Sequence, residues 1–294
     1  MVRINGRPKL RPQLLLLLAA ATLRGQARPN GTCTKMGAAP LWWLHVPKSG
    51  STFLNVVFRA GCPNGGLSPK PVVEASWLRR RIEGHNCSKN FMHFRSGHQP
   101  LSPATTPRTF VSLVREPLSR ALSGFYHNYH DCGDLQKQTG VKGQAKYRAS
   151  VYEPANRTKL LYYARCTSAC ATRMLVGLPC GWTPKHPGEA LAAYETRSTA
   201  EDAALVPAAL RALRDEERTG YVGLSSRFEE SVRAFAQFAN IQLIQRDFAH
   251  MRSRSIPAMI HQEARAMLQN FKFVDQEVYD EAVRLFERRL ASCA

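Results

Sequence analysis

The sequence is short of acidic residues, and this shortage sets its overall charge. Only 22 of its 294 residues are Asp or Glu against 41 Lys or Arg, which gives a formal net charge of +19, and no acidic residue precedes Glu74. Such an excess favours a polyanionic partner: nucleic acid, an anionic membrane, an acidic polysaccharide or a nucleotide. The recognisable nucleic-acid-binding motifs are absent as well, so we expect no nucleic-acid partner.

The N-terminal apolar run is too short for a transmembrane helix. It covers the ten residues Leu14–Leu23, whereas a bilayer needs about 20 residues in a helix. Basic residues precede this run and small residues follow it to Ala27, which predicts a secretory signal peptide over 1–27. A signal anchor that holds the protein to a membrane requires the flanking residues, and an organellar transit peptide is the alternative for this Arg-rich segment.

The chain also lacks paired CxxC knuckles, which argues against a cysteine-ligated zinc site. Its eight cysteines form an even set that permits up to four disulfides in an oxidising lumen. Cys132, Cys166, Cys170 and Cys180 lie close in sequence, and we predict that they staple loops as disulfides. Three N-glycosylation sequons agree with a secretory protein and begin at Asn30, Asn86 and Asn156.

The alternation of short apolar runs with helical patterns predicts an α/β fold with a mostly parallel sheet flanked by helices. Residues 28–40 are expected to form a linker and 41–294 the folded domain, with an irregular cysteine-rich insertion around 131–200 that contains short helices. The predicted strands are 41–46, 91–94, 109–114 and 221–224. The predicted helices are 51–59, 117 to about 130, 201–218, 228–239 and 275–290.

A candidate phosphate-binding turn follows the first predicted strand. It reads Pro47-Lys48-Ser49-Gly50-Ser51-Thr52 and leads into a predicted helix. Backbone N–H groups and the helix dipole favour an anion at such a junction, and Lys48 adds a cation. The turn is not the GxxxxGK[ST] loop of nucleoside triphosphatases, because Lys48 precedes Gly50 and the first glycine is absent. Taken alone, it also fits a strand-to-helix turn with an exposed lysine.

A second candidate phosphate site follows the third predicted strand. Arg115 stands at the carboxyl end of this strand, where its guanidinium can form two hydrogen bonds to a phosphate. Pro117 then opens a helix on which Ser119 and Ser123 share one face. The two junctions lie about 65 residues apart and on separate strand–helix units.

Together, the two motifs resemble those of the sulfotransferases that use 3′-phosphoadenosine 5′-phosphosulfate (PAPS). The first resembles that family's 5′-phosphosulfate loop, Pro-Lys-[Ser/Thr]-Gly. The second resembles its Arg-[Asp/Glu]-Pro segment with a serine eight residues after the arginine. The resemblance implies a P-loop-like sulfotransferase fold, PAPS as co-substrate and no metal ion. It assigns residues 47–52 to the 5′-phosphosulfate, and Arg115 and Ser123 to the 3′-phosphate.

Two further segments are similar to the Golgi carbohydrate-sulfotransferase branch, which includes the heparan sulfate 2-O- and 6-O-sulfotransferases. Residues 221–231 resemble that branch's Val-Gly-Leu-Thr-Glu-Arg-Phe segment, with Ser226 in place of the usual glutamate. Residues 278–286 resemble its C-terminal helix. This similarity implies a carbohydrate hydroxyl as the acceptor and the Golgi lumen or membrane as the location.

In such a reaction the acceptor hydroxyl loses a proton as it attacks sulfur in line, and charge builds on the departing phosphate. Lys48 suits that charge as a compact cation. A histidine suits the role of general base because its pKa lies near neutrality. We predict His98, which follows the second strand and resembles the branch's Gly-His segment, with His93 as the runner-up. The other histidines considered are His45, His85, His127 and His130.

The acceptor itself stays open at this stage. Basic residues near the predicted site can contact an acidic glycan, and these are Lys70, Arg79, Arg80, Arg81 and Arg95. A sulfotransferase for tyrosine or a small molecule would share the cofactor motifs but not the acceptor groove. A non-catalytic polyanion-binding module explains the charge but not two phosphate motifs in order. A P-loop kinase would need a Walker lysine and a Mg²⁺-binding aspartate, which do not stand in the expected context.

Overall fold

The computed structural model describes residues 36, 40–62, 87, 91–93, 98–101, 110–127, 129–132, 157–181, 191–248 and 258–293. These residues belong to one compact unit, Cys33–Ala294. Other predictions lie outside the described residues: the leader, most of the linker, the three sequon asparagines, His85 and the basic residues at 70, 79–81 and 95. Among the described helices, none is long and apolar enough to cross a membrane.

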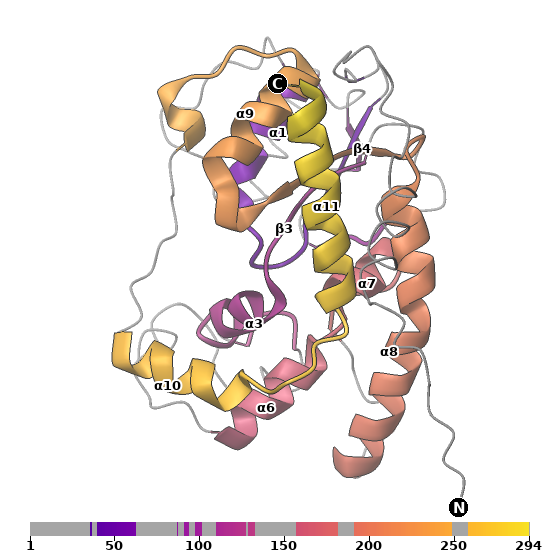
Figure 1. Ribbon diagram of the computed structural model, residues 1–294, viewed down its shortest axis with the longest axis vertical. Helices are drawn as coiled ribbons and strands as arrows, with labels where there is room; N and C mark the ends of the chain where they lie inside the picture. Colours follow the sequence, from indigo (N-terminus) through magenta and orange to yellow (C-terminus); the bar gives the residue numbers. More distant parts are fainter. Residues whose placement is uncertain are drawn as a thin grey trace, which may run out of the picture. The chain divides into compact units, whose positions relative to one another are not determined.

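A four-stranded parallel sheet forms the core of this unit (Figure 1). The strand order is β2-β1-β3-β4, and each neighbouring pair runs parallel. The strands are β1 (Leu41–Leu44), β2 (Phe91–His93), β3 (Phe110–Val114) and β4 (Thr219–Leu224). Every residue of β1 and β3 is buried, which explains why these segments are apolar, except for Ser112, rather than alternating. The predicted α/β class with a parallel sheet is confirmed.

Five of the described helices share the hydrophobic core of the sheet. They are α1 (Leu54–Gly61), α7 (Cys170–Leu175), α8 (Leu191–Arg214), α9 (Phe228–Ala239) and α11 (Gln276–Cys293). A short 3₁₀ turn, η1 (Ser51–Phe53), leads into α1. The ring of Phe53 contacts Trp43 of β1, Tyr221 of β4 and Phe235 of α9, so these aromatic side chains join α1 and α9 to one face of the sheet.

A second hydrophobic cluster lies around three other helices (Figure 1). These are α3 (Pro117–Phe125), α6 (Arg157–Cys166) and α10 (Ala258–Leu268), which pack against one another. The contact of α3 with α6 is close, because a Cβ atom added at Gly124 would lie 1.9 Å from the hydroxyl oxygen of Tyr163. Gly124 therefore lets the two helices approach.

The predicted helix from residue 117 to about His130 is shorter than expected. It ends at Phe125, and the backbone N–H groups of His127 and His130 both donate to the carbonyl of Gly124. Tyr129 and Asp131 have φ values of 49° and 65°, in the left-handed region that an α-helix cannot continue. The chain therefore turns back after α3, and this turn decides where His130 and Asp131 lie.

The predicted disulfides of the cysteine-rich segment are confirmed. Cys132 pairs with Cys166, and Cys170 pairs with Cys180. A further disulfide joins Cys62 at the end of α1 to Cys87. The short helices α6 and α7 lie within the predicted insertion, and the disulfides join their ends to neighbouring turns.

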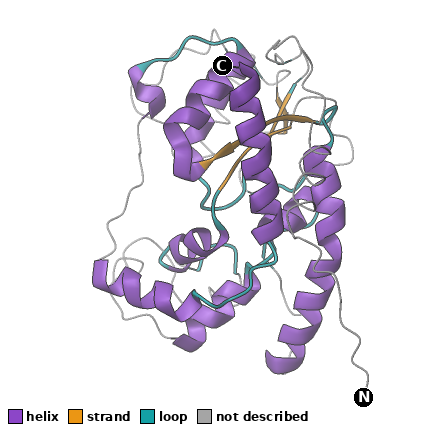
Figure 2. Ribbon diagram, viewed as in Figure 1, coloured by secondary structure: helices purple, strands orange, loops and turns teal. Residues whose placement is uncertain are grey.

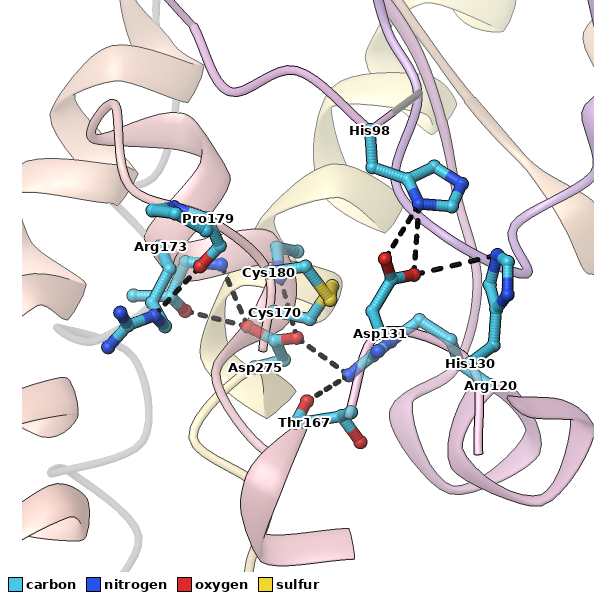
Figure 3. The surroundings of a disulfide bond; sticks show 12 residues. His98, Arg120, His130, Asp131, Thr167, Cys170, Arg173, Pro179, Cys180 and Asp275 are labelled. Atoms are coloured by element: carbon cyan, nitrogen blue, oxygen red, sulfur yellow. Dashed lines mark hydrogen bonds and ion pairs between the residues drawn. A yellow bond between two sulfur atoms is a disulfide. The ribbon is translucent and has the colours of Figure 1, made fainter. Parts of the chain in front are cut away.

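A buried ion pair joins α3 to the segment that precedes α11 (Figure 3). Arg120 Nη2 lies 3.0 Å from Asp275 Oδ2 and donates to the carbonyl of Thr167. The carboxylate of Asp275 also accepts hydrogen bonds from the backbone N–H groups of Ala171 and Thr172 at the start of α7. Both charged side chains are almost completely buried. Both members of the pair therefore have further hydrogen-bond partners inside the protein.

Replacing Asp275 by alanine is expected to lower the free energy of unfolding by about 3–5 kcal/mol, because it leaves the buried Arg120 charge and two N–H groups without their acceptor. Chemical denaturation followed by circular dichroism measures this loss. Asp280→Ala on the exposed face of α11 is the control, with an expected change within about 0.5 kcal/mol. Equal midpoints for the two variants would show that the pair contributes little.

Candidate functional site

The predicted site residues gather at the carboxyl edge of the sheet, where parallel strands all end on the same side. His45 directly follows β1, Arg115 follows β3 and Ser225 follows β4. His98 comes five residues after the end of β2. Figure 2 shows the described loops, in teal, between the strands and α3. Four strands therefore contribute to one edge, which is where ligand sites form in folds of this class.

The turn after β1 has the backbone conformation of a tight strand-to-helix junction. Lys48 has a φ of 62°, which is uncommon for a residue with a side chain. Gly50 has a φ of 106°, and a Cβ atom there would lie 2.7 Å from Leu113 Cδ2 of β3. Position 50 therefore requires glycine for both its conformation and its contact with β3. The backbone strain at Lys48 is of the kind that collects at functional sites.

The structure brings the two predicted phosphate motifs into direct contact. Arg115 Nη1 donates a hydrogen bond to the carbonyl oxygen of Lys48, at 3.2 Å. The strand register agrees with this contact, since Leu44 at the end of β1 pairs with Ser112 of β3, three residues before Arg115. The hydroxyl of Ser112 also donates to the carbonyl of Leu44, at 2.9 Å. The side chain of Arg115 therefore lies against the turn that contains Lys48.

Arg115 is a partly buried cation without a carboxylate partner. Burial lowers the pKa of its guanidinium, and the nearby Arg120 lowers it further, while Glu116 acts in the opposite direction. The side chain of Glu116 does not pair with Arg115 but caps α3 by accepting from the N–H groups of Leu118 and Ser119. Arg115 forms no ion pair within the described part of the chain. A partly buried cation that forms no ion pair can bind an anionic ligand.

The remaining residues of the two motifs lie nearby along the chain. Pro47 and Ser49 are buried and Ser51 is half-buried, whereas Thr52 is buried within η1. The Ser49 hydroxyl has no hydrogen-bond partner among the described residues. Ser123 is half-buried on α3, eight residues after Arg115, and the described contacts do not join it to the turn.

The segment after β4 also reaches this turn. The hydroxyl of Ser225 donates to the carbonyl of Ser49, which ties the β4–α9 junction to the candidate phosphate loop. The hydroxyl of Ser231 accepts from the N–H of Leu224 and donates to the carbonyl of the same residue. Ser226 is exposed. The part of residues 221–231 that contacts the site is therefore Ser225.

A cluster of histidines surrounds one aspartate at the same edge (Figure 3). His98 Nδ1 lies 2.9 Å from both carboxylate oxygens of Asp131. His130 Nε2 lies 3.5 Å from Asp131 Oδ2. The ring centroid of His98 is 4.7 Å from that of His45 and 4.8 Å from that of His130. Segments from β1, from beyond β2 and from the turn after α3 thus meet at Asp131.

Several contacts fix Asp131 in place. The Tyr163 hydroxyl donates to the carbonyl of His130, at 2.8 Å, and the adjacent Cys132 is disulfide-bonded to Cys166. A Cβ atom at Gly181 would lie 1.8 Å from the carbonyl oxygen of Asp131, so the 181 segment approaches it closely. A residue held this firmly in a left-handed conformation can orient an imidazole.

The electrostatics of the cluster favour an ionised Asp131 and a neutral His45. Burial would raise the pKa of Asp131, but the hydrogen bond from His98 and the nearby His130 hold it below its usual value. Burial lowers the pKa of His45 well below 6.5, and the other imidazoles and Lys48 lower it further. Lys48 is therefore one of the charged groups that favour a neutral His45.

The sequence pointed to His98 but not to its partner Asp131. The predicted helix ran to about His130, and no role was predicted for the next residue, Asp131. One feature of the sequence could have indicated this site: His127, His130 and Asp131 lie close together, directly before Cys132. The side chain of His93 lies outside the described residues.

We compared the chain with protein-family models, curated proteins and solved structures, and none of them matches.

Proposed function

We propose that this protein is a PAPS-dependent sulfotransferase of the secretory pathway that acts on a carbohydrate hydroxyl. The contact between Arg115 and the Lys48 carbonyl carries the proposal, because it joins two separately encoded phosphate motifs in one place. The parallel sheet and the strand–turn–helix junction after β1 agree with a P-loop-like sulfotransferase fold. The disulfides agree with an oxidising lumen such as the Golgi.

Each residue has a distinct role in the proposed site. The turn 47–52 and the start of α1 hold the 5′-phosphosulfate through backbone N–H groups and hydroxyls. Arg115 and Ser123 hold the 3′-phosphate, for which a partly buried guanidinium that forms no ion pair is suited. PAPS, when bound, supplies the sulfuryl group that is transferred. Lys48 places its ammonium beside the oxygen that bridges sulfur and the departing phosphate.

The proposed base is His98, oriented by Asp131. Because the Asp131 carboxylate accepts a hydrogen bond from Nδ1 of His98, the proton of a neutral imidazole lies on Nδ1. Nε2 of His98 is then left with the lone pair that removes the acceptor's proton. The acceptor oxygen forms its bond to sulfur as the sulfur–oxygen bond to phosphate breaks, and the proton moves to Nε2.

Transfer of labelled sulfate from PAPS by the full chain tests the proposal. The acceptors are a panel of desulfated glycans, a tyrosine peptide and a simple phenol. Label on one or more glycans is the expected result. Label on the peptide or phenol alone would move the acceptor to another class. A chain that labels no acceptor and does not bind adenosine 3′,5′-bisphosphate would refute the proposal.

Arg115→Ala is expected to weaken binding of adenosine 3′,5′-bisphosphate by about 10- to 100-fold, since a hydrogen bond between charged groups contributes about 1.5–3 kcal/mol. Isothermal titration calorimetry measures this change. Arg211→Ala on the exposed part of α8 is the matched control and should bind with unchanged affinity. Equal affinity of Arg115→Ala and the parent protein would remove Arg115 from the cofactor site.

A further inference from the structure

Two imidazoles and one carboxylate, from His98, His130 and Asp131, have the composition of a transition-metal site. His98 and Asp131 are also the proposed base and the residue that orients it. One ligand atom from each of these residues lies within 4.8 Å of the other two. Imidazole nitrogens and a carboxylate oxygen are ligands that Zn²⁺ prefers, whereas Mg²⁺ and Ca²⁺ favour all-oxygen sites. The described cysteines are disulfide-bonded and do not compete for this role.

The distances within this trio suit a tetrahedral ion. Ligands about 2.0–2.1 Å from a tetrahedral Zn²⁺ lie roughly 3.3 Å from each other. His98 Nδ1 is 2.9 Å from Asp131 Oδ2, and His130 Nε2 is 3.5 Å from the same oxygen. The two imidazoles therefore already flank one carboxylate oxygen, and with all three ligand atoms within 4.8 Å of one another, side-chain rotation can bring them around one ion.

The Asp131 carboxylate is incompletely satisfied by its neighbours. Its Oδ2 is buried and accepts no well-formed hydrogen bond among the described residues, although two imidazole nitrogens lie beside it. A buried carboxylate oxygen of this kind favours a cation. The left-handed backbone at Asp131 and the close approach of Gly181 hold this oxygen in position before any ligand binds.

We propose that His98, His130 and Asp131 form a binding site for one zinc-class metal ion, and that the bound ion inhibits sulfotransfer. Three protein ligands leave a fourth position for water. The inhibition part rests on the proposed function. Coordination through Nδ1 of His98 requires the imidazole proton to move to Nε2. The nitrogen that would accept the substrate proton then carries one already and cannot act as the base.

Zinc titration of the full chain, after chelator treatment and desalting, tests the site directly. Calorimetry is expected to show one Zn²⁺ bound per chain, with Mg²⁺ failing to compete. Co²⁺ should give the visible absorption bands of a tetrahedral site. His130→Gln and Asp131→Asn should each weaken zinc binding at least about 10- to 100-fold. Loss of a residue that only hydrogen-bonds to a metal ligand already has an effect of this size. His127→Gln should bind normally, because His127 is not among the three ligands.

The outcomes separate this proposal from the proposed function. A protein that binds no Zn²⁺ at one-to-one stoichiometry, or whose His130→Gln variant binds as the parent does, has no such site, even if it transfers sulfate. Stoichiometric binding that depends on the three residues supports the site, even if no sulfate transfer occurs. In an active enzyme, zinc should inhibit the parent and act on His130→Gln only at concentrations at least tenfold higher; equal sensitivity would refute the inhibitory role.

Discussion

Lys48→Ala is expected to lower the rate of sulfotransfer by at least about 10²–10³-fold. This is the effect of removing one preorganised group that stabilises the charge developing in a transition state. The charge in question forms on the phosphate oxygen that departs from sulfur. Lys48 lies in the turn after β1, at the carboxyl edge of the sheet, and its charge contributes to the lowered pKa of His45. Single-turnover transfer from labelled PAPS measures the rate of the chemical step.

The variant should remain folded, and this separates a chemical role from a structural one. Alanine at position 48 meets the same left-handed backbone conformation as lysine, so the turn loses little stability from the change. The exposed Lys272→Ala is a matched control for the loss of one positive charge and should keep full activity. Normal turnover by Lys48→Ala would exclude Lys48 from the reaction.

His98→Ala is expected to lower the rate by about 10²–10⁴-fold, the range for loss of a general base. Affinity for adenosine 3′,5′-bisphosphate should not change, because His98 follows β2 whereas the phosphate motifs follow β1 and β3. Rate measurements at saturating PAPS, together with calorimetry of the bisphosphate, test both statements. Added imidazole should restore part of the lost activity, since it can occupy the space left by the side chain.

Asp131→Asn provides a second test of the proposed pair of His98 and Asp131. An amide can present its NH₂ group to His98 and so favour the wrong tautomer, which should lower kcat more than it raises KM. His261→Ala on α10 is a matched control for the loss of an imidazole and should be fully active. Full activity of His98→Ala would move the role of base to His93 or to another group.

The α/β class was predictable from local pattern. Segments 41–46 and 109–114 are short, mainly apolar runs followed by turn residues, and the structure confirms strands at Leu41–Leu44 and Phe110–Val114. Buried parallel strands leave this signature because both of their faces are covered by helices. Helix ends were less predictable, as α3 shows by ending at Phe125. The contacts that end it involve the turn after the helix and Tyr163 of α6, and neither is visible in a local pattern.

The sequence by itself determined the elements and the residues of each motif: a turn with Lys48 and Gly50, a strand that ends in Arg115, and cysteines that pair. These follow from interactions between near neighbours in the chain, such as backbone preferences and the alternation of apolar and polar residues. Tertiary structure alone decided that Arg115 lies against the Lys48 carbonyl and that His98 and His130 both contact the carboxylate of Asp131. The contacts of Arg115 with Lys48 and of His98 with Asp131 join residues 67 and 33 positions apart, so they depend on how whole strands and helices pair and pack. The position of His130 beside Asp131 depends on the turn that reverses the chain after α3.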